Sequence, residues 1–199
     1  MASKPPFLTP VSGEDVPELA QLVRDVEQYL GFAATDVMTM ARLPAHTKAY
    51  LEFALTVMQE ATLPPALLQM VTLIASAASG CRYCTAHAAT VSKRAGVDEQ
   101  KIAAVWEYAT NPLFSDQERA VLGFAFKAAK SPSTLGPSDY DDIRRFLNDT
   151  EITEVLLAVA QMGFFNRWND TVGTVLEEQP LMFAKRTLPQ VHWQPGKHE

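Results

Sequence analysis

The 199-residue sequence contains little cysteine, little glycine and no long apolar run. Its two cysteines exclude a domain held together by a framework of several disulfides. The longest weakly polar run, about 67–84, is interrupted by five polar side chains, so we expect no membrane span. Glycine occurs only 9 times, and the longer segments repeat apolar residues every three or four positions. This spacing is typical of α-helices, and the sequence predicts an all-α protein.

Net charge and chain length exclude further classes of protein and partner. With 17 Lys and Arg against 23 Asp and Glu, the net charge is −6, and no block of basic residues occurs, which argues against a nucleic-acid partner. Residues 1–7 have no signal-peptide pattern, so we expect a reducing, cytoplasmic location. The length favours one domain over 1–199, large enough to need no disulfide or metal for stability.

The predicted helices follow from apolar spacing and from start and stop signals. Ser115 with Glu118 three residues later is a capping-box pattern that begins one of them, and Ser138 with Asp141 begins another. We expect helices over about 14–30, 46–61, 66–79, 81–95, 98–109, 119–130, 138–147, 150–165 and 166–176. From Gln179 onward, prolines predict an extended tail that wraps the surface or a partner subunit, and Trp193 within it suggests docking.

Two stretches align without gaps at an offset of 85 residues. Residues 69–75 lead to Cys81-Arg82-Tyr83-Cys84, and residues 154–160 lead to Asn166-Arg167-Trp168-Asn169. A chance match between apolar helices is one interpretation. We favour an internal duplication in which each half is a helix-turn-helix unit. The second half would then be a structural copy, with its two asparagines capping a helix start.

The chemical centre of the sequence is Cys81-x-x-Cys84-x-x-His87. Residues three apart on a helix share a face, so the two sulfurs can approach each other. The first turn of a helix also stabilises a thiolate through its dipole and its free N–H groups. His87 lies one turn beyond Cys84 and can exchange a proton with that thiol.

Three interpretations of this motif compete. In the first, the residues are small buried side chains beside a satisfied histidine. In the second, they supply three zinc ligands, but the sequence offers no second pair to complete the site, and we expect no metal and no cofactor. A redox-active dithiol is the interpretation we favour, because the only two cysteines stand in register.

These residues resemble a known family. Cys81-x-x-Cys84 after a helix that ends in small residues, the segment 115–120, and the echo at 163–170 are similar to the AhpD-like (alkylhydroperoxidase D-like) branch of the carboxymuconolactone decarboxylase superfamily. The resemblance covers roughly residues 30–176, with 179–199 as a tail. It implies an AhpD-like helical bundle, a trimer or hexamer, and thiol peroxidase activity on hydroperoxides. It also implies a protein or small-molecule dithiol as reductant.

The resemblance assigns roles to the two cysteines. It implies that Cys84 attacks the peroxide and that Cys81 resolves the resulting sulfenic acid to a disulfide. Helix-dipole reasoning alone would favour Cys81 as the nucleophile, because it is nearer the helix start. His87 would move a proton in either scheme.

The sequence departs from the family pattern at two relay positions. Gln69 stands where the peroxidases usually have a glutamate, and Ala88 stands where they usually have a histidine. Another carboxylate would have to take part, and Glu60 and Glu154 are the candidates that the sequence suggests. Gln69 nevertheless remains a candidate for the relay or pocket wall.

Tyr83, within the motif, is a candidate for the mouth of a thiol pocket, although it would equally suit the core or the surface. Two other functions remain open at this point. One is a cofactor-free lactone decarboxylase, which would need acid and base groups rather than two thiols. The other is a non-enzymatic redox-sensing or scaffolding oligomer, which the departures at Gln69 and Ala88 would permit.

Overall fold

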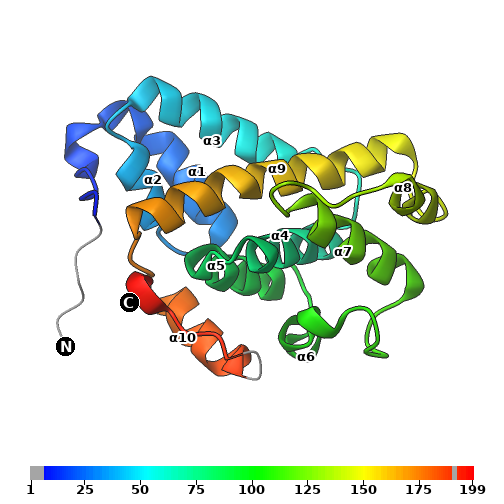
Figure 1. The fold of residues 1–199 in the computed structure, drawn as a ribbon. Coiled ribbons are helices and arrows are strands. Elements are labelled where there is room, and N and C mark those ends of the chain that lie inside the picture. The colour runs from blue at the N-terminus through cyan, green and yellow to red at the C-terminus, as the bar shows by residue number, and fades with distance from the viewer. Residues whose placement is uncertain (1–6, 190–191) are drawn as a thin grey trace.

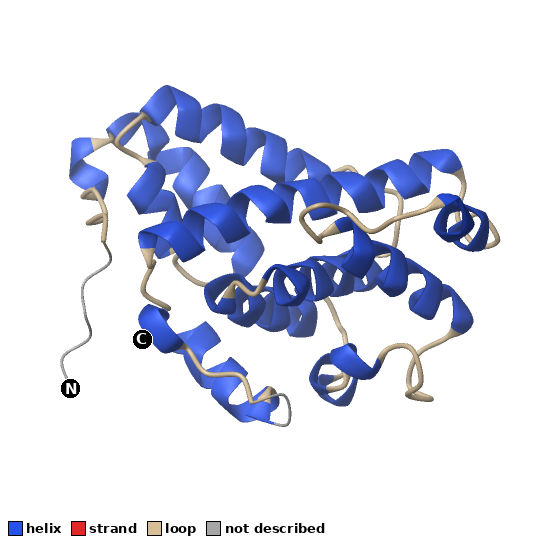
Figure 2. Cartoon of the chain, viewed as in Figure 1, coloured by secondary structure: helices blue, strands red, loops and turns tan. Residues whose placement is uncertain are grey.

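The computed structural model describes residues 7–189 and 192–199. Within these ranges the secondary structure consists of α-helices and short 3-10 helices, with no strand, as Figure 2 shows. The predicted all-α class is therefore confirmed. Among the helices described, none is both long and apolar enough to cross a bilayer. Residues 1–6, on which the expectation about a signal peptide depends, lie outside the described part.

The helices follow one another with short connections. Their bounds are α1 Ala20–Leu30, α2 Thr35–Met40, α3 Pro44–Gln59, α4 Pro65–Ser79, α5 Arg82–Arg94, α6 Glu99–Ala103, α7 Asp116–Ala128, α8 Pro137–Ile143, α9 Asp149–Val172 and α10 Glu178–Thr187. The 3-10 helices are Gly13–Asp15, Pro17–Leu19, Val105–Glu107 and Gly196–His198. Most agree with the predicted ranges within a few residues, and α2 and α10 are the two α-helices that the sequence did not lead us to expect.

The helix α4 lies at the centre of the molecule. It packs against α5, α7 and α9, and ten of its fifteen residues are buried. On the other side of α9, helices α1, α2 and α3 form a second layer with a smaller apolar cluster of its own, and α10 covers α5 (Figure 1). The space between the main core and this second layer is where the candidate site lies.

The turn between α4 and α5 places the two cysteines. Gly80 ends α4 with φ at +76°, a left-handed conformation that glycine adopts without a steric penalty. Cys81 is then the N-cap of α5, and its sulfur accepts the backbone N–H of Cys84 at 3.3 Å. The sequence reading of this helix pair is confirmed, with the start of α5 one residue later than expected.

The second stretch of the internal repeat folds differently from the prediction. The expected break between two helices at 165–166 is wrong, because α9 runs unbroken from Asp149 to Val172. Asn166 and Asn169 are buried inside it and cap nothing. The reason lies at the turn: Phe165 occupies the position that matches Gly80, and an L-residue there favours continuing the helix.

The C-terminal segment also differs from the expected extended tail. Residues 178–187 form α10, with Pro180 in the first turn, where a missing N–H breaks no hydrogen bond. The chain then returns over its own α5, and the Trp193 indole N–H donates to the Arg82 carbonyl at 3.3 Å. Trp193 therefore docks on the same chain.

Two helix starts test the capping predictions. The Ser115–Glu118 capping box is confirmed, with the Ser115 N–H donating to the Glu118 carboxylate at 2.8 Å. The start at Ser138 with Asp141 is wrong: α8 begins at Pro137, and the Asp139 carboxylate accepts the Gly136 N–H at 2.9 Å. Proline at the first helical position, preset to a helical φ, decides this start.

Candidate active site

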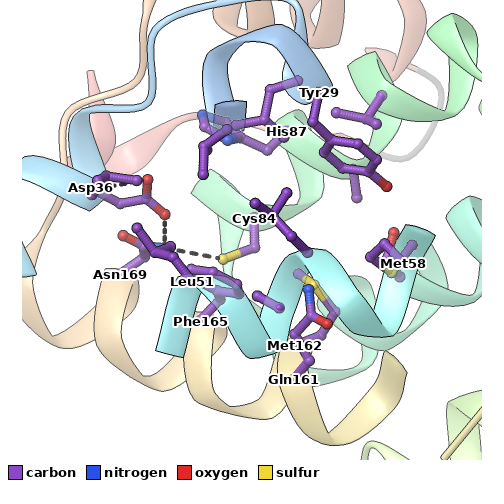
Figure 3. Close-up of a pocket in the computed structure, with 18 of the residues that line it drawn as sticks. Tyr29, Asp36, Leu51, Met58, Cys84, His87, Gln161, Met162, Phe165 and Asn169 are labelled. Carbon is purple, nitrogen blue, oxygen red and sulfur yellow. Dashed lines mark hydrogen bonds between the residues drawn. The ribbon is translucent and has the colours of Figure 1, made fainter. Parts of the chain in front are cut away.

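A cavity lies between the two helical layers. It has a volume of about 110 Å³. An apolar cavity of about 150 Å³ in another protein binds benzene, so this one suits a small apolar group. Its lining residues, from α1, α2, α3, α4, α5 and α9, are Val26, Tyr29, Leu30, Asp36, Val37, Leu51, Ala54, Leu55, Met58, Gln69, Thr72, Tyr83, Cys84, His87, Ala88, Val91, Gln161, Met162, Phe165 and Asn169. Figure 3 shows ten of these labelled around the Cys84 sulfur.

The two cysteines have different positions relative to this cavity. Cys84 lines it, whereas Cys81 is not among the described lining residues and lies behind it at the N-cap of α5. Both side chains are buried and carry free thiols. Burial raises the pKa of Cys84 well above its usual value, the neighbouring Cys81 and Asp36 raise it further, and a hydrogen bond from Asn169 lowers it. Of the two thiols, that of Cys84 is the one that lines the cavity and could contact a molecule within it.

A buried polar network surrounds the Cys84 sulfur. The Asn169 amide nitrogen of α9 donates to the Asp36 carboxylate at 3.1 Å and lies 3.6 Å from Cys84 Sγ, as the dashed lines in Figure 3 mark. On its other side the Asn169 amide oxygen accepts the Thr174 hydroxyl at 2.7 Å. Burial raises the pKa of Asp36, against the opposing effect of His87.

The His87 ring is paired with a carboxylate that sequence reasoning missed. Its Nε2 lies 2.6 Å from Glu177 Oε2, at the segment that leads into α10. The other Glu177 oxygen accepts the Tyr83 hydroxyl at 2.9 Å and the Thr35 N–H at 2.6 Å. Burial of Glu177 opposes ionisation, but the charge and hydrogen bond of His87 and the Thr35 N–H outweigh it and lower the pKa to about 2. The ionised carboxylate of Glu177, just before α10, therefore links that helix to α2 and α5 through these contacts.

Gln69 lies on the cavity wall, as the sequence suggested. Its side-chain amide donates to the Tyr29 hydroxyl of α1 at 2.5 Å, and the Thr72 hydroxyl donates to the backbone carbonyl of Gln69 at 2.8 Å. Burial raises the pKa of Tyr29 to about 12, so this hydroxyl stays protonated at neutral pH. Tyr29 and Gln69 also line an outer hollow between α1, α3, α4 and α5. The cavity shares three apolar residues with that hollow, namely Leu55, Met58 and Val91. The Gln69–Tyr29 pair thus stands where the cavity meets that hollow.

The sequence-predicted residues divide into those at the site and those away from it. Cys84, His87, Tyr83 and Gln69 all line the cavity, and Tyr83 is buried with its ring 4.1 Å from that of His87. The cavity lining among the described residues includes neither Glu60 nor Glu154.

Each of those two glutamates has a place elsewhere in the fold. Glu60 is the residue that follows the last turn of α3. The Glu154 carboxylate accepts the backbone N–H groups of Thr62 and Leu63, which holds the α3–α4 connection onto α9.

Three polar residues of the site escaped sequence reasoning: Asp36, Asn169 and Glu177. The repeat did contain a signal for Asn169, because at an offset of 85 it matches Cys84, and the two side chains meet in the fold. Nothing local marks Glu177, which is 90 residues from His87 along the chain. Within the described residues, no cluster of three or more His, Cys, Asp or Glu side chains is arranged to hold a metal ion.

Comparisons with known proteins agree with this architecture. The carboxymuconolactone decarboxylase family model matches residues 44–127, which span α3 to most of α7 and include both cysteines and His87. The predicted resemblance to that superfamily is confirmed over these residues, and the predicted AhpD-like helical fold is confirmed by a solved structure with an AhpD core. No curated protein sequence matches the chain.

Solved structures resemble the chain over most of its length. The debrominase Bmp8, as a cysteine-to-alanine variant in complex with 2,3,4-tribromopyrrole, is 29% identical with a TM-score of 0.86, covering 90% of this chain and 96% of that one. An uncharacterized peroxidase-related protein with an alkylhydroperoxidase AhpD core, from Ralstonia eutropha JMP134, is 20% identical with a TM-score of 0.80, covering 92% and 97%. The second likeness establishes the shared fold alone.

The low pKa of Glu177 predicts an acid-dependent loss of stability. A carboxylate with a folded pKa of about 2 stabilises the fold fully above its usual pKa of 4.5, and this stabilisation is lost as the pH falls toward 2. We expect wild type to lose up to about 3 kcal/mol of unfolding free energy across that window relative to Glu177→Gln. Urea unfolding at several pH values measures the difference. The exposed neighbour provides the control, because Glu178→Gln should keep the wild-type acid dependence, and an identical profile for Glu177→Gln would contradict the prediction.

Proposed function

We propose that this chain is a dithiol-dependent oxidoreductase that reduces a small, largely apolar organic molecule, with organic hydroperoxides as the first substrate class. One observation carries the proposal: Cys84 lines an apolar cavity, while Cys81, three residues earlier, does not line it and accepts the Cys84 N–H with its sulfur at 3.3 Å. That placement supports Cys84 as the thiol that meets the substrate and Cys81 as the resolving thiol. It favours this assignment over the one suggested by the helix dipole alone.

The reaction with a hydroperoxide has two steps. The Cys84 thiolate attacks the distal peroxide oxygen, the O–O bond breaks, and Cys84 sulfenic acid and an alcohol form after the leaving oxygen takes a proton. The Cys81 thiol then displaces water from the sulfenic acid to form the disulfide. His87, which lines the cavity and is hydrogen-bonded to Glu177, is the residue to which we assign this proton transfer. A protein or small-molecule dithiol in a reducing compartment such as the cytoplasm would restore both thiols.

A halogenated aromatic ring is the second candidate substrate. The same two electrons would replace a carbon–halogen bond with a carbon–hydrogen bond, releasing halide and a proton and leaving the same disulfide. Two observations favour it: the cavity walls are mainly apolar, and the debrominase that resembles this chain was crystallised with a tribromopyrrole. The ring would lie against side chains such as Leu51, Met162 and Phe165.

Thiol consumption separates the two substrate classes. We expect one equivalent of an organic hydroperoxide to remove both free thiols of the reduced protein, and excess dithiol to restore them. The measurement is stopped-flow oxidation followed by thiol titration, with hydrogen peroxide, cumene hydroperoxide and 2,3,4-tribromopyrrole compared. Bromide release with disulfide formation would instead identify the halogenated class.

The two cysteine variants are the controls. Cys84→Ser should abolish substrate consumption, whereas Cys81→Ser should still consume one equivalent and stop at a Cys84 adduct or sulfenic acid. Full turnover by Cys84→Ser would overturn the assignment. Slow oxidation by every compound would favour a redox-sensing or scaffolding oligomer, and lactone decarboxylation with both thiols intact would favour a decarboxylase.

Gln69 provides a test of the missing relay carboxylate. Gln69→Glu would place an acid–base group on the cavity wall, where general acid–base catalysis can add a factor of ten or more to a rate. We expect hydroperoxide turnover to rise by about tenfold and to gain a new pH-dependent limb. Gln69→Met, which keeps the side-chain shape but carries no proton, should not raise the rate, and an unchanged rate in Gln69→Glu would show that this position relays no proton.

We further propose that the chain forms a homo-oligomer, a trimer or hexamer. Phe53 of α3 and Leu157 and Phe164 of α9 support this, because each of these large apolar side chains is about two-fifths exposed or more. We expect light scattering to give a mass of several protomers and Phe164→Ser to lower it. Met182→Ser, which removes an exposed apolar side chain from α10, should leave the mass unchanged, and a monomeric wild type would contradict the proposal.

A further inference from the structure

The Cys84 sulfur lies in surroundings that disfavour a negative charge. The titratable groups that face it are Asp36 from α2, Tyr50 from α3, and Cys81 and Tyr83 from its own end of α5. Each is neutral or negative at neutral pH or above. Among the described residues that line the cavity there is no lysine or arginine, and the histidine there, His87, is paired with the Glu177 carboxylate at 2.6 Å. An anionic sulfur at this place therefore needs a hydrogen-bond donor.

Asn169 is the donor that the fold supplies. It lies in the last turn of α9, fully buried, and its amide nitrogen is 3.6 Å from Cys84 Sγ. The amide has two N–H groups, and the Asp36 carboxylate at 3.1 Å accepts one, which leaves the other for the sulfur. Burial inside a helix keeps this donor in place whatever the cavity contains.

The orientation of the amide is determined by its other contacts. The buried Thr174 hydroxyl donates to Asn169 Oδ1 at 2.7 Å, and the Asp36 carboxylate accepts from Nδ2. A flipped amide would turn its oxygen toward both the carboxylate and the sulfur, where two acceptors would face each other. Thr174 and Asp36 therefore orient the amide so that its second N–H points at Cys84.

We propose that Asn169, with its amide oriented by Thr174, is the hydrogen-bond donor that stabilises the anionic sulfur of Cys84. Asn169 is then a catalytic residue, since it touches the reacting atom, and Thr174 is a positioning residue. This inference deepens the proposed function, because it concerns the sulfur that the proposed reaction uses. It is nevertheless tested without any substrate.

A role in packing alone makes a different prediction, and Asn166 allows the comparison. Asn166 lies on the same helix one turn earlier, is buried, and has no hydrogen-bond partner for either amide atom among the described residues. It matches Cys81 in the repeat as Asn169 matches Cys84. If buried asparagines in α9 served only to fill space, removing either amide would affect Cys84 equally.

The test uses the full chain with Cys81→Ser, which leaves Cys84 as its single thiol. The ¹³Cβ chemical shift of Cys84 is followed against pH, and the rate of alkylation by iodoacetamide is measured at pH 8. In this background Asn169→Leu should raise the pKa of Cys84 by one unit or more and slow alkylation about tenfold. Thr174→Val should also raise the pKa of Cys84 and slow its alkylation, by smaller amounts. Thr174→Ser and Asn166→Leu should leave the pKa and the alkylation rate unchanged.

Circular dichroism establishes that each variant folds, and Thr174→Val decides the question if Asn169→Leu does not. The inference would be overturned if the pKa and the alkylation rate of Cys84 were unchanged in Thr174→Val and, provided that it folds, in Asn169→Leu. An equal shift in Asn166→Leu would overturn it too. The outcome is separate from that of the proposed function. A shifted pKa without substrate-driven thiol oxidation would retain the donor and reject the proposed reaction, whereas oxidation without a shifted pKa would do the reverse.

Discussion

The energetic cost of a charge on a buried sulfur is the constraint on which this site depends. Cys84 lies at the start of α5, which brings it near the free N–H groups of the first turn, yet its own N–H is directed to Cys81 Sγ. The apolar cavity on its other side suits a small organic molecule and raises the pKa of the thiol. The surrounding polar groups matter because one of them, Asn169, opposes this rise in the pKa of Cys84 through its hydrogen bond.

Two separate networks meet at the cavity, and both connect segments that are far apart in the chain. One runs from Thr174 through Asn169 to Asp36 and Cys84. The other joins Glu177 to His87, Tyr83 and the N–H of Thr35. Thr174 and Glu177 belong to the short connection between α9 and α10, which the buried His198 ring supports through a contact of 2.7 Å to the Thr174 carbonyl. The C-terminal segment thus holds the site together from outside the matched family region.

The departures from the peroxidase pattern acquire a physical meaning in this setting. Gln69 has no titratable proton, but it donates a hydrogen bond to Tyr29 where the cavity meets the outer hollow. The carboxylate that accompanies the histidine comes from Glu177 instead, on a different element from the one the resemblance implies. The chain therefore combines the AhpD-like fold with its own arrangement of polar groups around the two cysteines.

Local sequence determined the helices and the position of the thiols. Apolar spacing, the Ser115 capping box and Gly80 before Cys81 each act within one turn or two, so α4, α5 and α7 were predictable, and with them the motif that ends at His87. The continuation of α9 through Asn166 has a local cause as well, because Phe165 stands where the first repeat has Gly80. Only the tertiary structure decided that Asp36, Asn169 and Glu177 complete the site. The physical reason is that these residues depend on contacts between segments 85 or more residues apart, such as Cys84 with Asn169 and His87 with Glu177, and no periodicity along the chain records which buried polar groups will meet.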